Sequence, residues 1–495
     1  MTPNLVLAID QGTTGSRALL VDEHGASLAE ANRTHAQHHP APGAVEHDAI
    51  EILDAVRAVV GEVMAGVRSD QVAGVGITNQ RETIVVWDRA TGLPIAPAIV
   101  WQDSRTAPEC EALVAGGASE LVRSRTGLPI QPYFSATKLA WLIDHVPGAR
   151  ARADGGELAA GTMDCWLAWN LTGEHISDVT NASRTLLLDI DRLDWDPELL
   201  ALFMVPAALL PRVVSTWETG GLVGARVTGL AGVDAPLVAM IGDQQSALLG
   251  QGCRTEGQAK CTYGTGAFLL VNAGQTRPAG ATSLLVSPAS RVADGPVDYC
   301  LEGAMAVAGR AIGWLVDDLG LVSSAADTSE IAASVAGSDG VRVVPAFQGL
   351  YAPWWDARAR GSVTGLTLHS TKAHVVRATL ESLAFQTRAV LDAAERESGV
   401  TVPALKVDGG VTRNGFFVQA LADILGRPVV CAADAEATIH GAVVAAGIAC
   451  GFWDEAPPGP HGATVEPVWS KDRRDDEYAD WLRAVDHARG AIPTT

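Results

Sequence analysis

The chain has 495 residues, of which 47% are hydrophobic, and a formal net charge of −21 at pH 7. This length is too great for one hydrophobic core and predicts two large domains, and the apolar content is sufficient to fill both interiors. The negative charge argues against nucleic acid and anionic membrane surfaces as partners. A phosphate-bearing ligand would therefore be held locally, by backbone amides, a few arginines and a metal ion.

The apolar runs are too short to cross a membrane. Residues 5–9 and 442–449 are examples, far below the roughly 20 residues that span a bilayer. No basic region followed by a long apolar stretch opens the sequence, so we expect no signal peptide. The seven cysteines form no CxxC pair and no zinc-type spacing, which favours buried free thiols. We predict a cytoplasmic protein without membrane insertion.

The first predicted strand covers residues 5–9 and ends at Asp10, before a glycine-threonine turn and a second apolar run at residues 18–21. Glycines let backbone N–H groups approach phosphate oxygens, and the hydroxyls of Thr13 and Thr14 add donors. An Asp at a strand end can hold a divalent cation or accept a proton. One such hairpin alone is weak support for a phosphate site, because Gly-Thr turns are common in loops.

Short apolar strands then alternate with amphipathic helices. A helix is predicted over residues 50–67 and a strand over residues 72–77, which is the pattern of an α/β protein. Before them, His35, His38 and His39 lie in a polar stretch. We interpret this stretch as a solvated loop in preference to a metal site.

A second Asp-ended strand covers residues 236–243, and a hairpin with a turn at residues 264–266 follows it. A third glycine turn, at residues 409–410, precedes a helix with apolar periodicity, and helix N-termini favour phosphate groups. Two Gly-Thr hairpins that face each other would grip the phosphates of one nucleotide. The order of features predicts a duplicated fold with a nucleotide cleft between its halves, residues 1–250 and 251–495.

Two common nucleotide motifs are missing from the sequence. No glycine is followed directly by lysine, which excludes a P-loop, and no strand runs into a Rossmann glycine fingerprint. The paired hairpins resemble instead the arrangement of the actin, hexokinase and heat-shock ATPase superfamily. The segments that make the resemblance specific are DQGTT from Asp10, TNQRET from Thr78, WQ at Trp101, TNASRT from Thr180, GDQQ from Gly242, YGTG from Tyr263, YFSATKLAWLIDH from Tyr133 and GSVTGLTLHSTKAHVVRATLE from Gly361.

On these segments the chain resembles the FGGY carbohydrate kinases along its whole length, in particular those that phosphorylate glycerol. The resemblance implies an α/β fold of two actin/hexokinase-like (ribonuclease H-like) domains. The N-terminal domain would carry the polyol site and one phosphate hairpin, and the C-terminal domain the other hairpin and the adenosine site. It implies ATP and Mg²⁺ as cofactors and conversion of glycerol to sn-glycerol 3-phosphate, the first step of glycerol catabolism. The expected partners are glycerol, ATP and further copies of the chain, as a dimer or tetramer.

Phosphoryl transfer to an alcohol needs a base near the hydroxyl and a metal ion to neutralise the transferring group. Asp243 is the candidate base, as it is by resemblance, with a plain helix N-cap as the structural alternative. Asp10 is the candidate for organising Mg²⁺ through water, with a turn-capping role as its alternative.

The nucleotide is expected to contact both halves. Thr13, Thr14 and Arg17 would meet its phosphates from the first hairpin and Thr265 from the second, although Arg17 could instead be a surface charge on a strand. By resemblance, the adenosine would be framed by Gly309, Gly313, Gly410 and Asn414. The chain departs from the family pattern at two positions of the expected nucleotide site. Gly15 stands where Ser is usual, and Gly313 stands where a Gln often contacts the nucleotide.

A small triol needs polar partners for its hydroxyls and an aromatic wall for its carbons. The residues that would line it, as the resemblance also implies, are the polar set Arg81, Glu82, Tyr133, Asp243 and Gln244 and the aromatic residues Trp101 and Phe268. Taken singly, Arg81 and Glu82 could be an exposed ion pair, and the two aromatic rings ordinary core.

Two other functions remain open. One is an FGGY kinase that acts on a longer polyol or a ketopentose. Two features, the NQRET segment from Asn79 and the residue Trp101, favour glycerol over these substrates. The other is a non-catalytic, actin-like nucleotide-binding protein, which would have no need of residues that line a polyol.

The stretch of residues 220–236 bears on regulation. By resemblance, the corresponding loop of some relatives binds fructose 1,6-bisphosphate through Lys and Arg, and others are phosphorylated on a loop histidine. This stretch has one arginine, Arg226, no lysine and no histidine, and an added Asp234. We expect both controls to be absent, because such sites depend on charge-assisted contacts.

Overall fold

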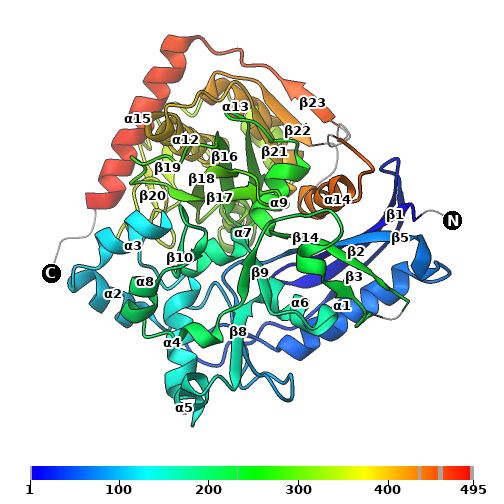
Figure 1. Ribbon diagram of the computed structural model, residues 1–495. Helices are drawn as coiled ribbons and strands as arrows, with labels where there is room; N and C mark the ends of the chain where they lie inside the picture. Colours follow the sequence, from blue (N-terminus) through cyan, green and yellow to red (C-terminus); the bar gives the residue numbers. More distant parts are fainter. Residues whose placement is uncertain (1–2, 231, 433–435, 455–460, 491–495) are drawn as a thin grey trace. The chain divides into compact units, whose positions relative to one another are not determined.

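The computed structural model describes residues 3–230, 232–432, 436–454 and 461–490 (Figure 1). The chain divides into two compact units. The first unit comprises Met1–Gly252, Val286–Tyr299 and Ala437–Gly459. The second comprises Cys253–Leu285, Cys300–Glu436 and Pro460–Thr495.

A twisted mixed sheet forms the centre of the first unit, in the order β13-β14-β5-β1-β2-β3. The hairpin of β1 and β2 is antiparallel and β3 continues it, whereas β5 runs parallel to β1 and β14 parallel to β5. The strands are β1 (Leu5–Gln11), β2 (Gly15–Asp22), β3 (Ser27–Thr34), β5 (Val72–Asn79), β13 (Arg226–Val227) and β14 (Ala235–Gly242). The carboxyl ends of β1, β5 and β14 therefore lie at the same edge of the sheet.

Helices cover both faces of this sheet, because successive strand side chains point to opposite sides. Leu7 and Ile9 of β1 pack with helices α1 (Ala49–Val63) and α6 (Met163–Thr172). Val6 and Ala8 face the other way, toward α14 (Ala437–Ala449). α14 lies in close contact with α9 (Asp243–Gly250), since a Cβ built on Gly441 would lie only 1.9 Å from the Ser246 carbonyl oxygen.

Smaller elements complete the first unit. A four-stranded sheet has the order β4-β7-β6-β8, from β4 (Glu46–His47), β7 (Ala98–Ile99), β6 (Ile84–Asp88) and β8 (Leu158–Thr162). The other helices are α2 (Ala107–Ala115), α3 (Ser119–Thr126), α4 (Ser135–His145), α5 (Ala149–Asp154), α7 (Val179–Ala182) and α8 (Pro197–Leu202). Short strands are β9 (Ile176–Asp178), β10 (Leu188–Asp189), β11 (Asp194–Trp195) and β12 (Arg212–Val214).

The second unit is built on a sheet that includes the order β18-β16-β15-β21-β22-β23. Its strands are β15 (Ala259–Tyr263), β16 (Ala267–Gly274), β18 (Val297–Met305), β21 (Leu405–Asp408), β22 (Val429–Ala432) and β23 (His461–Val465), and a separate pair joins β19 (Arg342–Val344) and β20 (Ser362–Thr364). β17 (Leu285–Arg291) groups with the first unit from Val286 onward. The helices are α10 (Gly309–Gly313), α11 (Asp327–Ala333), α12 (Lys372–Ser398), α13 (Gly415–Leu425) and α15 (Lys471–Gly490).

Tyr263 and Trp481 show how the helices of the second unit are held. The Tyr263 hydroxyl lies 2.7 Å from Thr387 Oγ1 of α12, and its ring packs on Phe417 of α13. Trp481 of α15 is fully buried and stacks on Phe385 of α12 with ring centroids 5.6 Å apart. The Tyr263 contacts join α12 and α13 to the sheet, and the Trp481 contact anchors α15, whose exposed face is highly charged.

The α/β class predicted from the alternation of strands and helices is confirmed. The helix predicted over residues 50–67 ends earlier, at Val63. The solvated-loop interpretation of the histidine stretch is wrong for His35, which is buried against His47 with ring centroids 4.9 Å apart. None of the cysteines forms a disulfide among the described residues, and all but Cys431 and Cys450 are buried. Across the described part of the chain, every helix is too short or too polar to cross a membrane.

Candidate functional site

Strand register brings together several of the residues predicted for the first unit. Gln11 at the end of β1 is aligned with Asn79 at the end of β5, and Asn79 is aligned with Gly242 at the end of β14. The Gln80 amide continues this alignment by donating to the Gln11 carbonyl at 2.7 Å. The segments that follow these strands therefore leave the sheet at one edge.

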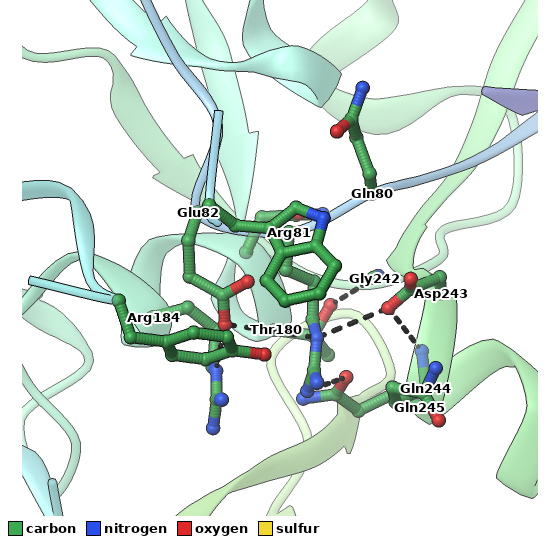
Figure 2. Close-up of polar contacts among 12 residues, drawn as sticks. Gln80, Arg81, Glu82, Thr180, Arg184, Gly242, Asp243, Gln244 and Gln245 are labelled. Carbon is green, nitrogen blue, oxygen red and sulfur yellow. Dashed lines mark hydrogen bonds and ion pairs between the residues drawn. The ribbon is translucent and has the colours of Figure 1, made fainter. Parts of the chain in front are cut away.

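Asp243 is the first residue of α9, and Gly242 occupies the N-cap position, so the helix-cap interpretation of Asp243 is wrong. Asp243 Oδ1 accepts from the Gln244 amide at 2.7 Å and lies 3.1 Å from Arg81 Nε. Arg81 also donates from Nη1 to Gln245 Oε1 at 3.0 Å. Figure 2 shows the Arg81 guanidinium between Asp243 and Gln245. The arginine thus fixes the orientation of the carboxylate.

Glu82 is buried rather than exposed, and its backbone is strained. Its φ is 62°, a left-handed conformation that is uncommon outside glycine and persists where the surroundings hold it. Arg184 Nε donates to Glu82 Oε1 at 2.6 Å, and Ser135 Oγ donates to the Glu82 carbonyl at 2.8 Å. Arg81 Nε is 3.9 Å from the same carboxylate. The exposed-ion-pair alternative for Arg81 and Glu82 is therefore excluded, because both are about 2% exposed.

Arg184 was not among the predicted site residues. It is fully buried, and its guanidinium lies over the rings of Phe134 and Tyr133, at 5.2 and 5.9 Å from their centroids. An arginine in such a place fixes both the glutamate and the aromatic rings. The only sequence signal was its position inside the conspicuous segment from Thr180.

Trp101, predicted for the aromatic wall, and Tyr133, predicted as a polar contact, form an aromatic wall in the first unit, whereas Phe268, the other residue predicted for the wall, belongs to the second unit. The rings of Trp101 and Tyr133 meet edge to face with centroids 5.5 Å apart, and both side chains are partly exposed rather than part of the core. Trp101 Nε1 donates to Thr13 Oγ1 at 3.0 Å. The predicted polyol wall and the predicted phosphate hairpin are thus in direct contact within the first unit.

Lys138 holds the backbone behind this wall and was also missed. Its fully buried ammonium donates to the carbonyls of Val100, Trp101 and Tyr133 at 2.9, 3.1 and 3.2 Å. Burial lowers the pKa of Lys138 to about 7, against the opposite effect of the nearby carboxylates of Asp103 and Glu82. Three carbonyl acceptors satisfy all three N–H donors of the charged form.

A buried polar network supports the start of α9. The Gly242 amide donates to Thr180 Oγ1 at 2.8 Å, and this hydroxyl donates to the Asp178 carboxylate. Asp178 also accepts from the Asn181 amide at 3.0 Å. Burial, with a smaller contribution from Asp164, raises the pKa of Asp178 to about 7. Thr180 therefore connects its own segment to the end of β14 next to Asp243, although Thr180 and Gly242 are 62 residues apart in the sequence.

The hairpin of β1 and β2 closes tightly, with the Gly12 amide donating to the Gly15 carbonyl at 2.8 Å. A Cβ on Gly15 would lie 2.7 Å from the Arg33 carbonyl oxygen of β3, so the neighbouring strand accounts for glycine at this place. Thr13 is partly exposed and Thr14 exposed, which leaves their hydroxyls near the surface. Arg17 pairs with Glu30 at 3.0 Å, so the surface-charge alternative has support for this residue.

Asp10 lies opposite Arg17 in the hairpin, and the charge of Asp243 acts on its carboxylate. Burial and, secondly, the charge of Asp243 raise the pKa of Asp10 to about 7, against the opposing effect of Arg17. Two carboxylates that repel each other in this way are a suitable donor set for Mg²⁺, which prefers oxygen ligands. The residues present therefore fit a divalent cation.

In the second unit, the turn between β15 and β16 contacts the start of α10. The carbonyl of Thr265 accepts from the amides of Ala308 and Arg310 at 2.8 and 3.2 Å, and the Gly309 amide donates to the Gly264 carbonyl at 2.9 Å. A Cβ on Gly309 would lie 2.7 Å from that same carbonyl oxygen, so this contact requires glycine. Thr265 and Gly309 are thus neighbours, as the nucleotide prediction needs.

The glycine turn after β21 approaches the same hairpin. Gly409 has a φ of 93° and packs so closely on Tyr263 that a Cβ would lie 2.3 Å from its carbonyl oxygen. Gly410, in contrast, has open space where a Cβ would be. Asn414 is the N-cap of α13, accepting from the Phe417 amide at 3.0 Å and donating to Thr328 Oγ1 at 2.9 Å.

Two predicted residues of the second unit lie away from these close contacts. Gly313 ends α10, where a Cβ would be 3.4 Å from Arg310 Nη1. Phe268 lies on β16 and is partly exposed.

The first unit thus combines an oriented carboxylate, a buried arginine–glutamate pair and an aromatic wall beside a glycine-threonine hairpin. This combination is typical of enzymes that act on a small polar alcohol and a phosphate donor.

Comparison with known proteins identifies the family. The chain belongs to the FGGY family of carbohydrate kinases, whose N-terminal domain matches residues 5–250 and whose C-terminal domain matches residues 259–450. The chain is 48% identical to a protein of Aromatoleum aromaticum named glycerol kinase, over 98% of this chain and 99% of that one. It is 46% identical to a protein of Streptomyces avermitilis named glycerol kinase 2, over 98% and 97% of the two chains.

A solved structure is similar along the whole chain. The crystal structure of Plasmodium falciparum glycerol kinase with ADP has a TM-score of 0.93 and 34% identity, and the match covers 99% of both chains. This match along the whole chain confirms the fold class that the resemblance predicted.

Proposed function

We propose that this chain transfers the terminal phosphoryl group of ATP to a primary hydroxyl of glycerol, forming sn-glycerol 3-phosphate and ADP. The observation that carries the proposal is the buried Arg81–Glu82–Arg184 cluster beside the Trp101–Tyr133 wall. Such a site offers charged partners to several hydroxyls and an apolar surface to a short carbon chain. The names of the similar proteins support the same substrate.

Asp243 acts as the general base in this proposal. A carboxylate oxygen accepts the hydroxyl proton as the new O–P bond forms and the bond from the phosphorus to the ADP oxygen breaks. Arg81, at 3.1 Å from Asp243 Oδ1, keeps the carboxylate in one orientation and can donate to a substrate hydroxyl as well. Glu82 accepts from a second hydroxyl, while Gln244 and Tyr133 offer further polar contacts and Trp101 and Phe268 pack on the carbons.

The nucleotide is assigned to both units. Thr13, Thr14 and Arg17 would hold its phosphates in the first unit, and Thr265 would do so in the second. Gly309, Gly313, Gly410 and Asn414 would frame the adenosine. Asp10 would hold Mg²⁺, which supplies positive charge to the transferring phosphoryl group when it is bound. A domain division into residues 1–250 and 251–495 is part of the same proposal, as are a cytoplasmic location and a homo-oligomer.

A comparison of substrates tests the function. We expect ADP release to be fastest with glycerol among glycerol, dihydroxyacetone, glyceraldehyde, erythritol, ribulose and xylulose. The Asp243→Asn variant should lose about 10² to 10⁴ of its turnover with glycerol. Asp54→Asn is the matched control, because Asp54 is an exposed carboxylate paired only at 3.4 Å with Arg57 of the same helix. A preference for ribulose or xylulose would replace glycerol by a ketopentose as the substrate.

A further inference from the structure

Two histidines and an aspartate converge in the second unit, outside every residue assigned to the kinase reaction. Asp339 comes shortly before β19, His369 follows β20, and His374 lies in the first turn of α12. The antiparallel pairing of β19 with β20, in which Arg342 is aligned with Thr364, brings these three segments together.

The ligand atoms of the three side chains point at one place. Nε2 of His369 and Nε2 of His374 each lie 3.3 Å from the same oxygen, Oδ2 of Asp339. The three ligand atoms all lie within 4.8 Å of one another, and the centroids of the two imidazole rings are 5.4 Å apart. Both histidines thus present their outer nitrogen to one carboxylate.

We propose that Asp339, His369 and His374 form a site for a transition-metal dication of the Zn²⁺ type. Bonds of about 2.1 Å in a tetrahedral arrangement separate neighbouring ligand atoms by roughly 3.4 Å, close to the spacing found here. The same spacing is longer than the roughly 2.7–2.9 Å of strong charge-assisted hydrogen bonds. Two imidazoles with one carboxylate select Zn²⁺, Co²⁺ or Ni²⁺ over Mg²⁺ and Ca²⁺, which prefer oxygen ligands alone.

The backbone and the surrounding hydrogen bonds hold two of these ligands in place. Asp339 has a φ of 48° and is followed by Gly340 at 80°, so a left-handed turn presents the carboxylate. His374 is buried, and its Nδ1 lies 2.9 Å from Thr371 Oγ1 and 3.0 Å from the Thr371 amide nitrogen.

Metal on Nε2 leaves the single ring proton of His374 on Nδ1, where the Thr371 hydroxyl is its acceptor, and this contact replaces the bond that Nδ1 accepts from the Thr371 amide in the structure. Without metal, Nδ1 accepts from the Thr371 amide and Nε2 carries the proton toward Asp339. His369 and Asp339 are exposed, so water can fill the remaining coordination position.

Metal binding to the whole chain tests this site without reference to activity. The protein is stripped with a chelator, which is then removed, and titrated with Zn²⁺ by calorimetry and with Co²⁺ by visible absorption. The Asp10→Asn background removes binding at the kinase site. We expect one equivalent of Zn²⁺ and a tetrahedral Co²⁺ spectrum, and we expect the affinity to fall at least about tenfold in His369→Ala and Asp339→Asn.

His369 and Asp339 are exposed, so these two changes leave the fold intact, which circular dichroism can verify. His24→Ala is the matched control, because His24 is an exposed histidine beside a carboxylate, with Nε2 3.9 Å from Glu23. It should bind Zn²⁺ like the parent. Equal binding by the parent and His369→Ala, or no binding by the parent at millimolar Zn²⁺, would overturn the assignment.

Discussion

Replacing Asp10 by Asn should abolish activity and yet stabilise the fold at pH 8. The pKa of Asp10 is raised from 3.8 to about 7, because burial and the charge of Asp243 disfavour the carboxylate. The folded state therefore binds a proton more tightly than the unfolded chain does. Stability is lost as the pH rises from about 4 to about 7, and above that range the folded protein carries an unfavourable charge.

The size of the effect follows from the same shift. One pKa unit corresponds to about 1.4 kcal/mol, which sets a ceiling on the order of 4 kcal/mol at pH 8. Because Asp10 is partly exposed, solvent screens part of this penalty, and we expect about 1–3 kcal/mol. Asn has a similar shape and no charge, so Asp10→Asn should recover this free energy of unfolding at pH 8 and gain nothing near pH 4.

Calorimetry or denaturant unfolding of the ligand-free protein at pH 4, 6 and 8 measures the gain. The matched control is Asp103→Asn, because Asp103 is a buried carboxylate that is well satisfied, accepting from the Val45 amide at 2.6 Å and pairing with Arg105. That variant should lose about 1–3 kcal/mol. If Asp10→Asn were no more stable than the parent at pH 8, or its gain were equal at pH 4 and pH 8, the electrostatic reasoning would be refuted.

Three further outcomes are expected. Lys138→Met should raise the KM for glycerol about tenfold or more and change the KM for ATP little, because the lost ammonium holds the Trp101 and Tyr133 carbonyls. Lys372→Met is the control, because Lys372 is exposed. Equal changes in both KM values would count against this role of Lys138. Propane-1,2-diol and propane-1,3-diol should have specificity constants lower by about 10-fold or more, since a missing hydroxyl leaves a buried charged group unpaired, and values equal to that of glycerol would contradict the site. Fructose 1,6-bisphosphate at millimolar concentration should not inhibit, because Arg226 is already paired with Asp234 at 2.8 Å; saturable inhibition would show that another surface binds it.

Local patterns predicted the strand ends and hairpins well. Asp10, Thr13 and Asp243 lie where their strands and turns suggested, because an apolar run followed by glycine is a signal within a few residues. The position of α14 in the first unit could not be foreseen in this way, since its contacts with α9 join residues about 200 positions apart.

The supporting residues of the site were missed for the same reason. Glu82 is oriented by Arg184, 102 residues away in the sequence, and the Trp101 loop is held by Lys138. His35 was assigned to solvent from its polar neighbours, whereas its amide and Nε2 contact the carbonyls of Thr14 and Thr13 at 3.3 and 3.1 Å. Burial of a polar side chain depends on tertiary partners that composition does not reveal.

Product analysis by ³¹P NMR tests the central claim most directly. Purified protein incubated with ATP, Mg²⁺ and glycerol should form ADP and glycerol 3-phosphate in equal amounts. Asp243→Asn should form them about 10² to 10⁴ times more slowly while glycerol still binds. Release of inorganic phosphate without glycerol 3-phosphate, or turnover of Asp243→Asn within a few-fold of the parent, would contradict the account.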